Sequence, residues 1–105
     1  NATGVSVNGN TITLDGVNAS GVIATVTVKF KGGGSNLKMA IVPDVTGGTV
    51  GVKLKSASNA VVAVTGNEVE IFPKKDANVE AVLEITLALT NTEANGTIYV
   101  VTQVY

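Results

Sequence analysis

The sequence predicts an all-β fold, a single β-sandwich or jelly roll of about eight or nine strands, from three observations. Val, Ile and Leu recur at every second position of most segments, and a period of two is that of a strand. Clusters of Gly, Asn, Asp and Ser interrupt these segments at intervals of roughly eight to twelve residues, as in sandwiches and jelly rolls. A length of 105 residues corresponds to one domain.

Two short strands are predicted at the N-terminal end. Residues 4–8 alternate, with Val5 and Val7 on one face, and residues 10–14 alternate in the same way. The intervening Asn8-Gly9 suits a type I′ hairpin that joins the two strands.

The middle of the chain contains the clearest alternation. Residues 21–31 place five apolar side chains on one face and polar or β-branched ones on the other. The triglycine turn that follows leads to a strand over residues 36–42. We expect Pro43-Asp44 to end that strand, because Pro cannot donate a ladder hydrogen bond. A further alternating strand is predicted over residues 49–55.

Four more segments complete the predicted fold. Residues 59–65 form a continuous apolar run, which fits a strand buried on both faces or one covered by a partner. The remaining strands are predicted over residues 68–72, 79–90 and 97–105. A helix is the competing prediction for residues 79–85, but the β-branched and Thr content downstream favours a strand.

The composition excludes several kinds of chemistry. The chain has no His and no Cys, so a Ser–His–Asp triad and imidazole or thiolate metal ligands are impossible. Glutamates at positions 68, 70, 80 and 84 alternate with apolar residues, as on the solvated face of a sheet. We therefore predict that the chain is not an enzyme, with no catalytic residues, no cofactor and no metal site.

Charge and hydropathy restrict the partners. The net charge is −1, only 4% of the residues are aromatic and none is Arg, so we expect no nucleic-acid binding. No apolar stretch reaches the ~20 residues that a membrane-spanning helix needs, so no membrane span is expected. The chain begins with Asn1, which indicates removal of a signal peptide from an extracellular or cell-surface protein, or removal of flanking sequence.

Two Asn residues in predicted loops carry the pattern of an N-glycosylation acceptor. They are Asn18, in Asn18-Ala19-Ser20, and Asn95, in Asn95-Gly96-Thr97. Unmodified Asn residues in turns are the simpler explanation for both.

The two ends of the chain are poorly protected against strand addition. Val5–Val7 and Ile98–Tyr105 alternate without any charged side chain, whereas edge strands are usually guarded by charge, Pro or a bulge. A short strand that completes a neighbour's sheet adds head to tail and need not close. We predict that residues 1–8 are such a donor strand, with Val5 and Val7 as its contacts, and that residues 9–105 form the sandwich body. Exchange of the C-terminal strand, or an intramolecular hairpin at Asn8-Gly9, stays open.

The processed start, the segment Gly4-Val5-Ser6-Val7, the Val- and Thr-rich body and the lack of Cys resemble the donor-strand filament subunits of archaeal bundling pili. Those are in turn similar to the TasA-like biofilm fibre proteins of bacteria. The resemblance implies a jelly-roll domain and a homopolymer, a pilus or filament that serves adhesion, bundling with neighbouring filaments, or biofilm formation. The alternatives are a non-catalytic extracellular binding module, carbohydrate-binding or cohesin-like, and a virion or S-layer component.

Overall fold

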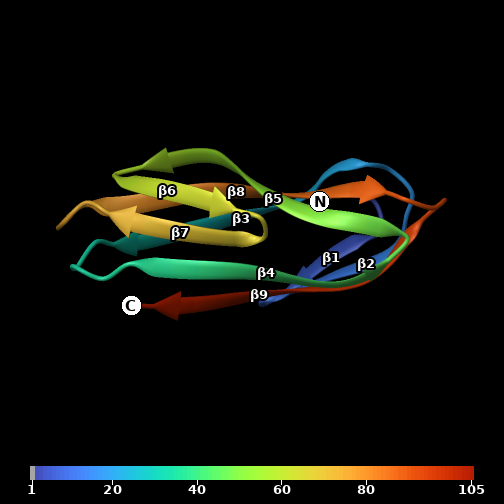
Figure 1. Cartoon of the computed structure of the whole chain (residues 1–105), viewed down its shortest axis with the longest axis horizontal. Helices are drawn as coiled ribbons and strands as arrows, with labels where there is room; N and C mark the ends of the chain where they lie inside the picture. Colours follow the sequence, from blue (N-terminus) through green and yellow to red (C-terminus); the bar gives the residue numbers. More distant parts are fainter. Residues whose placement is uncertain (1) are drawn as a thin grey trace.

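A computed structural model describes residues 2–105, and in that range it contains nine strands and no helix (Figure 1). The strands are β1 (Val5–Asn8), β2 (Thr11–Val17), β3 (Gly21–Lys31), β4 (Leu37–Thr46), β5 (Gly48–Ser58), β6 (Ala60–Thr65), β7 (Glu68–Pro73), β8 (Asn78–Leu89) and β9 (Ala94–Val104). The all-β prediction is confirmed, and the helix considered for residues 79–85 is wrong because these residues belong to β8.

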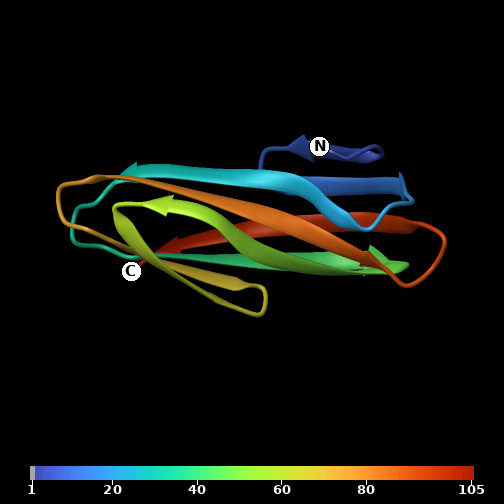
Figure 2. The ribbon, with the colours of Figure 1, turned by 90° about the horizontal axis from the view of Figure 1, so that it is seen from above.

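The strands form two antiparallel sheets of unequal size. One has six strands in the order β1-β2-β9-β4-β7-β6, and the other has three in the order β3-β8-β5. The two sheets lie one over the other in a sandwich-like, elongated molecule (Figures 1 and 2) that measures 46 × 23 × 20 Å. A single Gly47 separates β4 from β5 and carries the chain from one sheet to the other.

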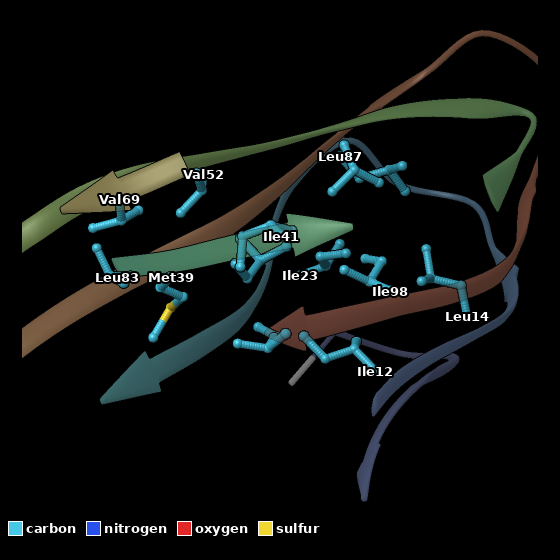
Figure 3. Close-up of a cluster of buried hydrophobic side chains, with 14 of the residues drawn as sticks. Ile12, Leu14, Ile23, Met39, Ile41, Val52, Val69, Leu83, Leu87 and Ile98 are labelled. Atoms are coloured by element: carbon cyan, nitrogen blue, oxygen red, sulfur yellow. The ribbon is translucent and has the colours of Figure 1, made fainter. Parts of the chain in front are cut away.

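The core lies between the sheets, and β8 supplies its largest share. Every second side chain of β8, from Val79 to Leu87, is at most 2% exposed, because β8 is the central strand of the smaller sheet. The six-stranded sheet faces it with aliphatic side chains such as Ile12, Met39 and Ile98 (Figure 3). Each such side chain contributes about 1.5–3 kcal/mol when fully buried, and no buried polar side chain interrupts them within residues 2–105.

The predicted end of a strand at Pro43-Asp44 is wrong. β4 continues to Thr46, and Pro43 pairs with Ile98 of β9. The pairing of β4 with β7 covers only Leu37–Ala40, so at Pro43 one side of β4 is already a sheet edge. Pro is tolerated at such an edge because its missing N–H removes no ladder bond there.

The apolar run at residues 59–65 is not a strand buried on both faces. It forms β6, the edge of the six-stranded sheet, where Val61 is 66% exposed. One face of β6 packs Ala60 and Val62 against the core, and the other leaves Val61 open to solvent. Other boundaries also move: β2 extends to Val17 through a register shift after Leu14, β5 extends to Ser58, and β9 begins at Ala94, three residues before the start predicted at residue 97.

Candidate functional site

The predicted donor segment forms a hairpin with the rest of its own sheet. β1 pairs with β2 in the register Val5↔Leu14, Ser6↔Thr13, Val7↔Ile12 and Asn8↔Thr11. The two central turn residues are Gly9 and Asn10, and of these only Gly9 has a positive φ, of 62°. This is the φ pattern of a II′ turn rather than the expected I′ turn, since II′ places Gly first. The intramolecular hairpin, which the sequence analysis kept as an alternative, is therefore present. Asn1, the first residue of the predicted donor strand, lies outside the described residues.

Val5 and Val7 share one face, as the alternation predicted, and in this structure it is the inner face of the sheet. Their partners Leu14 and Ile12 are each 2% exposed, and directly paired residues of an antiparallel ladder point to the same face. Val7 is nevertheless 49% exposed, because β1 is the outermost strand of its sheet. The strand therefore presents a preformed apolar face that its own domain covers only in part.

The attachment of β1 to the body is slight. In the described chain its ladder is the four-residue pairing with β2 alone. Two further backbone bonds flank it: the Asp15 N–H donates to the Gly4 carbonyl at 2.8 Å, and the Ala2 N–H donates to the Ile23 carbonyl of β3 at 3.1 Å. By comparison, β9 pairs with β2 on one side and with β4 over ten residue pairs on the other. Detaching the N-terminal strand therefore disrupts far less structure than detaching the C-terminal one.

A small cavity lies between β1 and the first strand of the other sheet. Its volume is about 140 Å³, and Val7, Ile12, Ala24, Val26 and Val100 supply its apolar lining. Here the sandwich is open along one side. The inner side chains Val26, Val28 and Phe30 of β3 are only partly buried, whereas those of the adjacent β8 are fully buried.

The same open side continues along β9. β2 pairs with β9 only up to Tyr99, so beyond that residue β9 has β4 as its one ladder partner within residues 2–105. Val104 pairs with Leu37 on the inner face and is still 68% exposed. Both sheets thus end on this side in incompletely covered apolar side chains.

The two outer faces of the molecule differ in polarity. On the three-stranded sheet, Lys29–Glu80 and Lys53–Glu84 form exposed ion pairs at 3.4 and 3.8 Å. The centre of the six-stranded sheet instead exposes a group that we call the outer apolar patch, which consists of Val42, Tyr99 and Val101 at 46–54% exposure. Val42 pairs with Tyr99 and Ala40 with Val101, so these side chains are neighbours on one face.

The glutamates singled out in the sequence do not converge. Glu80 and Glu84 lie on the outer face of one sheet, while Glu68 and Glu70 alternate with the buried Val69 and Ile71 and so face outward from the other. Glu68 lies 3.4 Å from the Lys38 ammonium, and Glu70 accepts a hydrogen bond from the Tyr105 hydroxyl. That bond raises the pKa of Tyr105 above its ordinary value of 10.0. Residues 2–105 contain no cluster of three or more potential metal ligands.

The two predicted glycosylation sites have different surroundings. Asn18 is exposed in the loop between β2 and β3. Asn95 is exposed near the start of β9, and its Oδ1 accepts a hydrogen bond from the Gly16 N–H at 2.8 Å. Asn18 is therefore the less constrained of the two, since it lies in no strand whereas Asn95 is held by that hydrogen bond.

No helix within residues 2–105 is long and apolar enough to cross a bilayer. Comparisons with protein-family models, with curated proteins and with solved structures give no match for this chain. The alternation in the sequence predicted that Val5 and Val7 lie on the same face of a strand. It did not indicate that β3 would be an edge strand, because the neighbours of a strand are set by the tertiary fold.

Proposed function

We propose that this chain is the subunit of an extracellular filament in which β1 of one copy completes the sandwich of the next. The observation that carries the proposal is that two features occur side by side: β1 is a weakly held apolar strand, and the sandwich next to it is open. β1 has one four-residue ladder, and the cavity next to it is lined by inner-face side chains of both sheets. Strand addition uses main-chain hydrogen bonds for affinity and alternate side chains for fit.

The choice of the N-terminal strand over the C-terminal one follows from position in the sheet. β9 lies between β2 and β4, so its departure would divide the six-stranded sheet in two. β1 leaves without breaking any other ladder. A donated strand would also enlarge the three-stranded sheet to four, which brings the sandwich closer to the two four-stranded sheets of a jelly roll.

The outer apolar patch supports lateral packing between such filaments. A soluble monomer rarely exposes grouped large apolar side chains without using them in contacts. Val42, Tyr99 and Val101 lie on the face opposite the core, so they remain exposed when β1 is exchanged. Bundling, adhesion or biofilm formation are the roles that fit a filament with an adhesive side, and an extracellular location follows from them.

A non-catalytic binding module is the second candidate function, and the C-terminal end of β9 favours it. Tyr105 is half exposed and shares a shallow hollow with Lys38, Glu70 and Gln103. An aromatic ring beside polar side chains is the kind of surface that holds a small polar ligand. A chain that stays monomeric at high concentration and binds sugars would be described by this alternative.

A disulfide that fixes β1 to its own β2 tests strand donation. Ser6 and Thr13 pair on the outer face and are both exposed, and paired strand residues lie within the Cα separation that a disulfide allows. The chain has no cysteine of its own, so the S6C/T13C variant forms one defined bridge. We expect oxidised S6C/T13C to stay monomeric and to form filaments after reduction, as seen by electron microscopy and light scattering.

The matched control is T13C/T97C, which joins β2 to β9 at a registered pair and leaves β1 free. This variant should form filaments in both redox states. Filaments from oxidised S6C/T13C would show that β1 is not the exchanged strand. A wild-type chain that stays monomeric at all concentrations would remove the proposal altogether.

A further inference from the structure

The intramolecular pairing of β1 with β2 is symmetric about the bond between Gly9 and Asn10. Every pair, from Asn8↔Thr11 outward to Val5↔Leu14, is equidistant from that bond. If the hairpin opened and two copies exchanged β1 strands in the same register, each copy would donate to and accept from the other. Such an exchange has twofold symmetry and closes as a dimer with no strand left to donate. An acceptor other than the edge of β2 avoids this closed dimer, and this step depends on the proposed function.

The free edges of the molecule are not equivalent as acceptors. β6 has six residues, and β5 is interrupted by a register shift between Leu54 and Ser56 beside Lys53 and Lys55. β3 has eleven residues and pairs regularly with β8 from Ala24 to Lys31. Within the described chain, β8 is its one ladder partner.

The edge of β3 lacks the usual protection over Ala24–Val28. This stretch contains no charged residue and no Pro, and its register shift lies before it, between Val22 and Ala24. Such an edge is a template for another strand unless charge, Pro or a bulge blocks it. Its inner side chains Val26 and Val28 are only partly buried, so an added strand finds an apolar surface as well as free backbone groups.

β1 already touches this edge within its own chain. Val7 lines the cavity together with Ala24 and Val26, and Ala2 is hydrogen bonded to Ile23. When β1 leaves, Val7 leaves the cavity with it and the side of β3 becomes more open. Donation of β1 by one copy therefore prepares that same copy to accept β1 from the next copy, and a growing filament requires this property.

We propose that the free edge of β3 over Ala24–Val28 is the acceptor for β1 of a second copy. The donated strand becomes the fourth strand of the sheet, in the order donor-β3-β8-β5. Val5 and Val7 then point inward beside Val26 and Val28, since both pairs are spaced by two residues. Ser6 faces outward next to the exposed Thr25 and Thr27.

Single-cysteine chains test this acceptor directly. S6C is mixed in turn with T25C, T27C, T13C and K53C under assembly conditions and is then oxidised, and the cross-linked peptides are identified by mass spectrometry. Filament formation by each mixture is recorded by electron microscopy. K53C is the matched control, because Lys53 is exposed on the outer face of the same sheet but on its other edge strand.

We expect a disulfide between S6C and T25C or T27C, and its loss when K53C is the partner. A product with T13C of another copy in place of the β3 products would assign β1 to the β2 edge and overturn the inference, although strand exchange would stand. Filaments without any β3 product would also overturn it. The absence of filaments in every mixture and in the wild type would reject the proposed function itself.

Discussion

Replacing Ile85 with Val separates local release of β1 from unfolding of the whole domain. Ile85 lies in β8 and is 0% exposed, and removing one methylene from such a site costs about 0.5–1.5 kcal/mol. This cost raises the unfolded population by a factor of about 2 to 13. The amides of β8 are in the centre of their sheet and exchange with solvent mainly through global unfolding, so their exchange should accelerate by that factor.

The release of β1 should not respond to the same substitution. Its four cross-strand pairs contribute roughly 0.2–1 kcal/mol each, and the half-exposed Val7 adds about 1 kcal/mol of apolar burial. The sum is roughly 2–5 kcal/mol, which lies at or below the 5–15 kcal/mol of a typical domain. Ile85 stays packed while β1 detaches, so Ile85→Val should leave the exchange of the β1 amides unchanged.

Native-state hydrogen exchange followed by NMR in dilute protein measures both rates. Val7→Ala is the complementary variant: it removes about 0.8 kcal/mol of half-buried side chain and should accelerate β1 and β8 amides alike by about fourfold. Equal acceleration of both sets by Ile85→Val would mean that β1 opens only when the whole domain unfolds. In that case the reasoning that makes β1 a detachable donor would be refuted.

Three further results are expected. Gly96→Ala should destabilise the fold by about 2 kcal/mol or more, because Gly96 has a φ of 136° and an added Cβ would clash with the Asp44 carbonyl. Thermal melting measures this loss of stability. Gly33→Ala is the control that should leave the melting temperature unchanged, because a Cβ at Gly33 meets no neighbour. Tyr105 should titrate above 10.0 by NMR and return toward that value in Glu70→Ala; because the folded-state pKa is raised, the stability that this bond adds is present below pH 10.0 and is lost as the pH rises through the raised pKa. The three Lys–Glu pairs lie at the surface, with only Glu84 partly buried, so a salt titration should change the free energy of unfolding by less than about 1 kcal/mol per pair, and a larger loss would show that they act as a network.

Alternation predicted the strands well where a single face is buried. The predicted strand over residues 21–31 coincides with β3, and that over 79–90 differs from β8 by one residue at each end. The end placed at Pro43 failed because the rule that excludes Pro from a sheet depends on whether a neighbouring strand is present. β7 covers β4 only up to Ala40, a fact of the tertiary fold that is not encoded near Pro43.

The candidate site was predictable in its donor half and not in its acceptor half. The period of two placed Val5 and Val7 on one face, and Asn8-Gly9 indicated the hairpin that the structure contains. Which edge remains open is settled by pairings between strands far apart in the chain, such as β3 with β8. Strand exchange between copies remains a prediction.

The central position of β9 has a consequence for how the domain forms. β9 connects β2 to β4, so the six-stranded sheet cannot form until β9 is available. Most pairings join distant segments, and such topologies fold in milliseconds to seconds rather than microseconds. A chain whose β9 has not yet emerged from the ribosome would hold β1 and β2 without the rest of their sheet, and removal of the whole of residues 94–104 should prevent folding instead of merely weakening it.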